Sequence, residues 1–207
     1  MRSSGLAGSQ LLLPASVAAG RPIRASGISM KASAELLAQL QALGAGELEH
    51  LDGSLETHLR GTEALLRSWG ACESLCVAGL YHAVYGTDGY SPALTSLAGR
   101  RSIAEAIGAE AEKLAYLYGA CNRKVFHPRI GTEAQLLFAD RLSNRDYGIQ
   151  PRQLAQLCEL ILSNELEIAS RSAQFRAKHG AALSRLFERM SGLVSEDGFQ
   201  AYHRILC

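Results

Sequence analysis

The sequence has neither an excess of one charge nor a long hydrophobic run. Its 21 Lys and Arg residues against 20 Asp and Glu give a formal net charge of +1. The basic residues are scattered and form no stripe of the kind that binds nucleic-acid phosphates. No apolar segment approaches the roughly 20 residues that a membrane-spanning helix needs. We therefore expect no nucleic-acid partner and no membrane span, and the oligomeric state stays open.

Two common phosphate-binding loops are missing, and cysteine is sparse. No Gly-x-Gly-x-x-Gly follows a predicted strand, and no Gly-Lys-Ser or Gly-Lys-Thr is present. The five cysteines are an odd number in a chain without a secretory signal, which predicts reduced thiols. Cys72 and Cys76 share a helix face, but no second pair accompanies them, so we interpret them as core residues and not as a zinc site.

Acidic residues are absent from the N-terminal segment. Residues 1–34 contain no Asp or Glu but four basic residues, Arg2, Arg21, Arg24 and Lys31. An acid-free segment rich in Ser, Ala and Arg resembles an organelle transit peptide. We predict that residues 1–31 are a transit-peptide-like or disordered extension and that residues 32–207 form one domain. The predicted location is a plastid or mitochondrion, or the cytoplasm if residues 1–31 are not a transit peptide.

From residue 32 onward, Gly, Pro and Ser interrupt segments with helical hydrophobic spacing. The predicted helices span residues 33–43, 54–69, 72–84, 102–121, 151–172, 174–191 and 196–206. Ser102 and Glu105 form a capping box for the fourth, and Pro151 suits the first turn of the fifth. Residues 122–150 break the helical period. The predicted fold class is mainly α, a single compact helical bundle with a short irregular or hairpin insertion near 125–150 in which Leu136–Leu142 is one possible strand.

Two histidines are expected to face each other inside this bundle. His58 lies on the apolar stripe of its helix and His82 on the inner face of the next. Each is about 11 residues, or about 17 Å, from the tight break at Gly70, which favours antiparallel neighbours. Two imidazoles at similar heights can share a metal ion at ~2.0–2.1 Å, and His50 in the preceding loop could supply a third nitrogen.

A plainer interpretation of these histidines stands beside the metal site. An inward histidine is more often a hydrogen-bonded core residue than a ligand. His127, His179 and His203 have no comparable support from spacing, so we expect them to be structural or exposed.

Residues 50–87 resemble the start of an HD-type metal-dependent phosphohydrolase domain. The segments that carry the resemblance are His50-Leu-Asp-Gly-Ser-Leu-Glu-Thr-His58 and Ala78-Gly-Leu-Tyr-His82-Ala-Val-Tyr-Gly-Thr87. A closer resemblance is to an uncharacterised HD-like family whose second histidine precedes a small residue and Tyr-Gly-Thr. It extends through Ile103–Cys121 and Ser163–Glu167. The fold that it implies is a bundle of the HD-domain type.

The resemblance matches the first HD histidine to His58 and the histidine of the His-Asp pair to His82. The aspartate of that pair is Ala83 here, which places a two-metal hydrolytic centre in doubt. A later helix-borne aspartate has two candidate matches, the Asn164/Glu165 position and Asp140 in the irregular segment. We prefer Asn164/Glu165 because that position lies on a long predicted helix.

The predicted metal ligands are His50, His58, His82 and Glu165, and Tyr85, Thr87 and Asn164 are the predicted substrate contacts. Nitrogen-rich ligands suit one divalent transition metal, with zinc or iron as the leading choices. The first hypothesis is a metal-dependent hydrolase of a small molecule, phosphorylated or not. The alternatives are a mononuclear iron oxygenase and a non-catalytic HD descendant that binds a ligand or a protein. Further candidates for anion binding are Arg60, Arg100, Arg101, Arg123 and Lys124.

Overall fold

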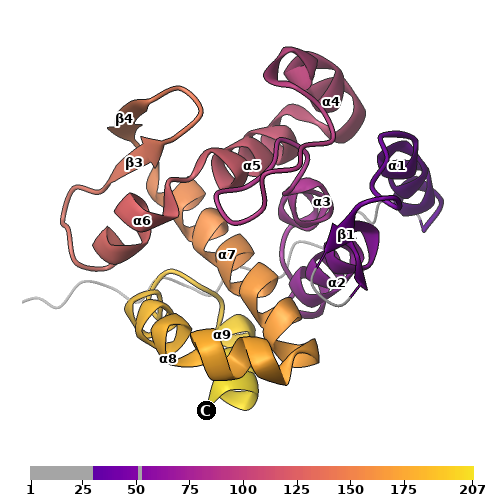
Figure 1. Cartoon of the computed structure of the whole chain (residues 1–207). Helices are drawn as coiled ribbons and strands as arrows, with labels where there is room; N and C mark the ends of the chain where they lie inside the picture. Colours follow the sequence, from indigo (N-terminus) through magenta and orange to yellow (C-terminus); the bar gives the residue numbers. More distant parts are fainter. Residues whose placement is uncertain (1–29, 51–52) are drawn as a thin grey trace, which may run out of the picture.

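Helix α7 (Pro151–Arg171) runs through the middle of the molecule, with helices packed along both of its sides (Figure 1). In this computed structural model the described residues are 30–50 and 53–207, and the side chains of residues 30–33, 49 and 50 are not described. The predicted N-terminal extension therefore lies almost wholly outside the described residues. The helix α7 begins with Pro151 at its first turn, as the sequence predicts.

The N-terminal helices pack on one side of α7. They are α1 (Met30–Ala42), α2 (Leu55–Ser68), α3 (Glu73–Tyr81), α4 (Arg100–Ile107) and α5 (Ala109–Ala120). The backbone amide of Thr57 donates to the Ser54 side chain at 3.2 Å, which caps the start of α2. The helices α2, α3 and α5 contact α7 directly. A short ladder of β1 (Glu49–His50) and β2 (Gly53–Ser54) precedes α2.

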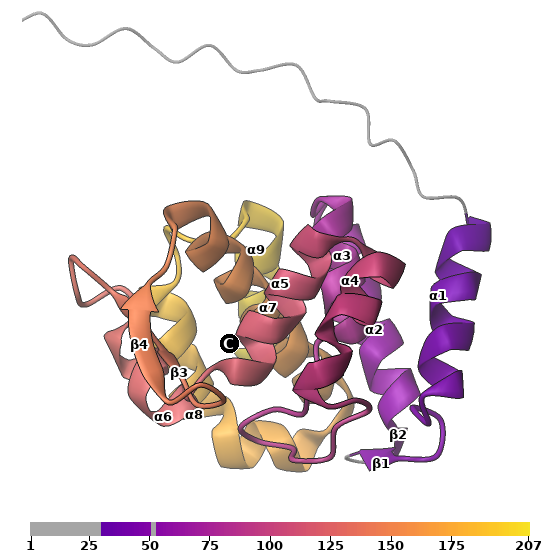
Figure 2. The same cartoon turned by 90° about the horizontal axis from the view of Figure 1, so that it is seen from above.

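The C-terminal helices α8 (Ala173–Arg189) and α9 (Glu196–Leu206) pack on α7 and on each other. Between α5 and α7 lie α6 (Arg123–Phe126), the 3₁₀ turn His127–Arg129 and a hairpin of β3 (Leu137–Asp140) and β4 (Arg145–Gly148). Figure 2 shows α1 at one end of the molecule and this hairpin at the other. The mainly α bundle and its hairpin insertion are as predicted from the sequence.

The predicted single helix from Ser102 to Cys121 was wrong. Two helices, α4 and α5, meet at Gly108, whose φ of 88° lies in the left-handed region that favours glycine. The capping box was wrong too, because Ser102 lies inside α4, which already begins at Arg100. The first helix also begins earlier than predicted, at Met30 and not at Ser33.

Asp140 organises the hairpin. Its carboxylate accepts hydrogen bonds from the backbone amides of Leu142 and Ser143 at 2.8 and 2.9 Å, and from the Tyr116 hydroxyl at 2.8 Å. Burial alone would raise the pKa of Asp140, but these hydrogen bonds outweigh it and the net direction is downward. Asp140 therefore stabilises the hairpin, and the other candidate for the late acidic position, Asn164/Glu165, lies on the long helix α7.

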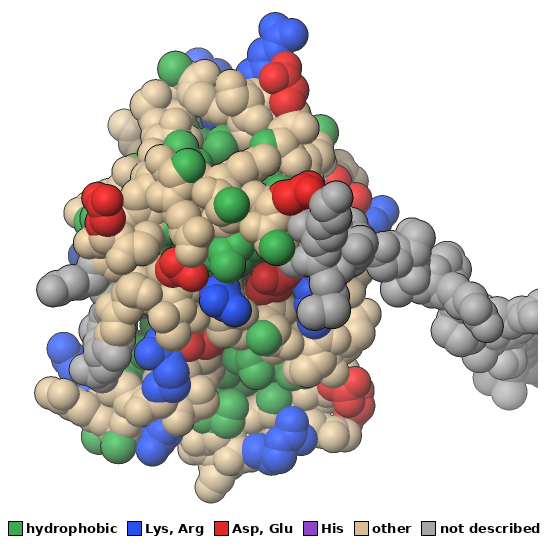
Figure 3. Space-filling model, turned by 90° about the vertical axis from the view of Figure 1, so that its right-hand side faces the viewer, with side chains coloured by type: hydrophobic (Ala, Val, Ile, Leu, Met, Phe, Trp, Pro, Cys, Tyr) green, Lys and Arg blue, Asp and Glu red, His purple; other side chains and the backbone are tan. Residues whose placement is uncertain are grey.

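The core has two hydrophobic clusters. One lies around α5, α7, α8 and α9, and the other around α1, α2 and α3, with Tyr116 packed against both. All five cysteines are free thiols. Cys76 is buried in the first cluster, as predicted, but Cys72 is exposed at the start of α3, so its prediction as a core residue was wrong. Cys121 and Cys158 are also buried in the first cluster. The face in Figure 3 carries Lys and Arg interspersed with Asp and Glu. Within the described part of the chain, no helix is both long and apolar enough to cross a bilayer.

Candidate functional site

His58 and His82 meet in the interior, as their spacing along the two helices predicts. Their ring centroids are 5.1 Å apart at an interplanar angle of 90°. Each residue is only 1% exposed. His58 comes from α2, and His82 directly follows α3, which packs against α2. The positions expected to share a role are therefore adjacent in space.

Helix α7 contacts both ring nitrogens of His58. Nδ1 lies 2.5 Å from Glu167 Oε2, and Nε2 lies 2.9 Å from Asn164 Oδ1. Glu167 also accepts two hydrogen bonds from Arg171, at 2.6 and 2.9 Å. Burial by itself raises the pKa of Glu167, but the hydrogen bonds from His58 and Arg171 outweigh it and lower the pKa overall. His58 is thus held between two polar side chains of one helix.

His82 has a different arrangement. Its Nδ1 donates to the Gly79 carbonyl oxygen at 2.7 Å, which places the acceptor lone pair on Nε2. The ring also packs edge-on against Tyr118, with a centroid distance of 4.9 Å. A histidine fixed in one tautomer by a carbonyl is suited to hydrogen bonding, proton transfer or metal ligation through the other nitrogen.

The polar network continues along α7 beyond His58. The Asn164 amide nitrogen donates to Glu165 Oε1 at 3.1 Å, and Arg123 Nη1 donates to the same oxygen at 3.0 Å. Arg123 Nη2 donates to the Tyr118 hydroxyl at 2.7 Å. The Asn164 side chain therefore links the His58 pair to the Arg123–Glu165 pair, and its amide orientation is set by its two neighbours.

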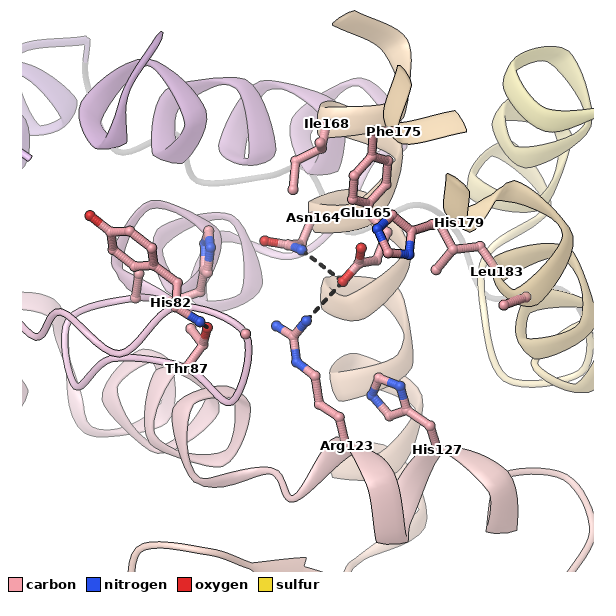
Figure 4. A pocket seen from close by; sticks show the side chains of 14 residues that line it. His82, Thr87, Arg123, His127, Asn164, Glu165, Ile168, Phe175, His179 and Leu183 are labelled. Atoms are coloured by element: carbon pink, nitrogen blue, oxygen red, sulfur yellow. Dashed lines mark hydrogen bonds and ion pairs between the residues drawn. The ribbon is translucent and has the colours of Figure 1, made fainter. Parts of the chain in front are cut away.

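A pocket of about 400 Å³ opens beside this network, and we call it the central pocket. Figure 4 shows Arg123 and Glu165 at its middle, with His82 and Thr87 on one side and Phe175, His179 and Leu183 on the other. The polar lining is His82, Thr87, Arg123, His127, Asn164, Glu165 and His179, and the apolar lining includes Ala83, Ile168, Phe175, Ala182 and Leu183. A volume of this size suits a small organic molecule.

Two of the pocket's histidines were missed by sequence reasoning. His179 packs against Phe175 with ring centroids 4.7 Å apart, one turn away on α8. The spacing of Phe175, His179 and Leu183 was a signal that these residues share a face. His127 follows α6 directly, and nothing in its spacing indicated a place in the pocket.

The ring of His127 has an unusual environment. Its Nε2 is buried and has no hydrogen-bond partner among the described residues. Burial, followed by the nearby Arg123 guanidinium group, lowers the pKa of His127 to about 4; Asp88 acts in the opposite direction, and Arg189 adds a smaller lowering effect. The native pocket therefore favours neutral His127.

Some of the predicted substrate contacts and anion-binding residues line the central pocket, and others lie outside it. Thr87 and Asn164 line the pocket. Tyr85 does not: it is buried elsewhere, and its hydroxyl donates to Glu112 Oε1 at 2.9 Å. Among the five basic candidates, Arg123 lines the central pocket. Arg60, Arg100 and Arg101 pair with Glu56, Glu112 and Glu105, and Lys124 is exposed.

The described side chains do not gather the predicted metal ligands into one group. Among the described side chains, no group of three or more His, Cys, Asp or Glu residues is arranged to hold one. His58 Nε2 faces Asn164 Oδ1, and Glu165 Oε1 is paired with Arg123. The side chain of His50 lies outside the described residues, so its predicted role is not addressed.

Comparison with known proteins adds one finding. A family model described as a domain of unknown function (DUF6817) matches residues 39–123. The matched segment contains His58, His82 and Arg123 but ends before α7, which supplies Asn164, Glu165 and Glu167. Neither a curated protein nor a solved structure matches the chain.

Proposed function

We propose that this chain is a metal-independent, small-molecule-binding protein with an HD-like site, and that the central pocket takes a ligand with an apolar body and a polar or anionic head. The observation that carries the proposal is the contact of both His58 ring nitrogens with α7. A histidine engaged on both sides by protein atoms joins two helices, which is the task that a shared metal ion would otherwise perform.

The two positions that resemble the HD carboxylates support this view. They are Ala83 and the Asn164/Glu165 position; Ala83 and Asn164 offer no anionic oxygen that would favour divalent metal, and Glu165 Oε1 accepts hydrogen bonds from Arg123 and Asn164. Ala83 has no ligating atom in its side chain, and Asn164 already bonds His58 and Glu165. The central pocket still opens next to these residues, and Ala83 and Asn164 both line it.

The lining indicates the kind of ligand. Ile168, Phe175 and Leu183 provide an apolar surface for a hydrocarbon or aromatic body. Arg123 provides donors for an oxygen-bearing head group, and His82 is held in one tautomer by the Gly79 carbonyl oxygen. The hydrolase and oxygenase hypotheses remain predictions; each requires one ring nitrogen of His58 to leave its present partner, Asn164 at Nε2 or Glu167 at Nδ1, before a metal could bind there.

Binding of benzoate, phenyl phosphate and benzyl alcohol, followed by NMR chemical shifts in the presence and absence of EDTA, tests the proposal. We expect at least one probe to shift signals of His82, Asn164 and Phe175, with no effect of EDTA. A blocking variant, Ala182→Trp, places an indole at the pocket wall from an exposed position of α8. It should abolish these shifts.

Ala181→Trp is the matched control, because Ala181 is also exposed on α8 but does not line the central pocket. It should bind the probes as the wild type does. Binding that appears only after zinc or iron is added would contradict the proposal and favour the metalloenzyme. Probe shifts that persist in Ala182→Trp would place binding elsewhere.

A further inference from the structure

The central pocket adjoins a second hollow with a different chemistry. This hollow, which we call the arginine annex, has a volume of about 400 Å³ and is lined by Arg123, Arg185 and Arg189 together with His127 and Thr132. Arg123, His127, Ala182 and Leu183 line both spaces, so the two share a wall. None of the described Asp and Glu residues lines the annex.

Two of the three arginines have no carboxylate partner among the described residues. Arg189 donates to the backbone carbonyl oxygens of His127, Ile130 and Arg185, which fix its position without neutralising its charge. Arg185 is exposed on α8 and takes part in none of the ion pairs of the described chain. Arg123, by contrast, is already paired with Glu165. The annex thus carries two uncompensated positive charges.

The wall between the two spaces contains a second observation that points to a ligand. His127 lies there, and its buried Nε2 has no partner among the described residues. Buried polar atoms are normally satisfied, so this nitrogen is a candidate for a bond to a bound molecule. One ligand that spans both spaces could contact His127 and the two arginines together.

We propose that the ligand of the central pocket is an organic phosphate whose phosphoryl group lies in the arginine annex, bound by Arg185, Arg189 and His127. The inference rests on the proposed function and names the class of its ligand. Two guanidinium charges match the −1.5 to −2 that a phosphate monoester carries at about pH 7, and guanidinium groups bind phosphate oxygens with favourable geometry. A single carboxylate would leave one of these charges unmatched.

The test compares phenyl phosphate with benzyl alcohol, which has a similar apolar body and no charge, by calorimetric and NMR titration. Arg185→Gln removes one annex charge from an exposed position, so it should not disturb folding. We expect it to weaken phenyl phosphate binding about tenfold and to leave benzyl alcohol unchanged. Inorganic phosphate should compete with phenyl phosphate and not with benzyl alcohol.

Arg204→Gln is the charge-matched control, because Arg204 is exposed on α9 and lines neither space. It should keep phenyl phosphate affinity within about twofold of the wild type, as expected for a screened surface charge. Equal weakening by both variants would overturn the annex as a specific site. If phenyl phosphate binds no more tightly than benzyl alcohol, the annex is overturned as a phosphate site and the proposed function still stands. If no probe binds, both the annex and the proposed function are overturned.

Discussion

His58 Nδ1 lies 2.5 Å from Glu167 Oε2, across the contact between α2 and α7. Both side chains are buried, with 1% and 6% of their surfaces exposed. Arg171 and Asn164 complete the arrangement from the same face of α7. This contact joins the segment matched by the domain of unknown function to the helix that lies beyond it.

Glu167→Gln should destabilise the protein. The change removes the negative charge that faces His58 and Arg171, so a buried polar group loses its charged partner. We expect the free energy of unfolding to fall by about 2–3 kcal/mol, measured by urea denaturation. Glu105→Gln is the control, since Glu105 forms an exposed i,i+4 pair with Arg101 and should cost less than about 0.5 kcal/mol. Equal losses in the two variants would contradict the role given to Glu167.

Gly61 leaves room for the Glu167 side chain. A Cβ atom at Gly61 would lie 2.7 Å from Glu167 Oε1 and 2.8 Å from its Cγ. Gly61→Ala should therefore lower the free energy of unfolding by about 1–3 kcal/mol, even though alanine favours a helix. Gly180→Ala, inside α8, has its nearest contact at 3.9 Å and should be neutral or stabilising by up to about 1 kcal/mol. A stable Gly61→Ala protein would indicate that Glu167 can move away.

His127 predicts a loss of stability in mild acid. Its pKa is lowered to about 4 in the folded protein, mainly by burial, against an ordinary value near 6.5. Between these two pH values the unfolded chain therefore binds more protons than the folded protein does. The contribution of His127 to the free energy of unfolding is fully present above about pH 6.5 and is lost as the pH falls toward 4. His127→Leu should reduce the loss of unfolding free energy between pH 7 and pH 5. Exposed His203→Leu is the control, and an unchanged pH profile in His127→Leu would contradict the account.

Restoring the carboxylates of the HD pattern tests the resemblance. The double variant Ala83→Asp/Asn164→Asp would place two anionic oxygens beside His58 and His82. We expect it to bind about one equivalent of zinc or manganese by calorimetry, whereas the wild type binds none at this site. The single variant Ala83→Ser controls for the added polarity. A folded double variant that binds no metal would argue against an HD-like origin of the site.

Much of the bundle is predictable from sequence because it depends on local signals. Pro151 marks the start of α7, Ser54 caps α2, and hydrophobic spacing turns His58 and His82 inward. The break at Gly108 was missed because the helical period continues on both sides of it, and the left-handed backbone there has no mark apart from the glycine itself.

The site was only partly predictable, because its decisive contacts join residues far apart in the chain. Helical spacing brought His58 and His82 together, and the long helix favoured Asn164 as their neighbour. Nothing local indicated that Glu167 would face His58 across 109 positions, or that His127 would line the pocket. Such pairings depend on how the helices pack, which periodicity does not specify.

Elemental analysis of the purified protein, prepared without chelator, tests the central claim most directly. If His58 links α2 to α7 through Glu167 and Asn164, the wild type should contain less than about a tenth of an equivalent of zinc, iron, manganese, cobalt, nickel or copper. The His58→Ala/His82→Ala double variant should give the same values. About one equivalent of metal in the wild type that disappears in the double variant would contradict the account and restore the metalloenzyme hypothesis.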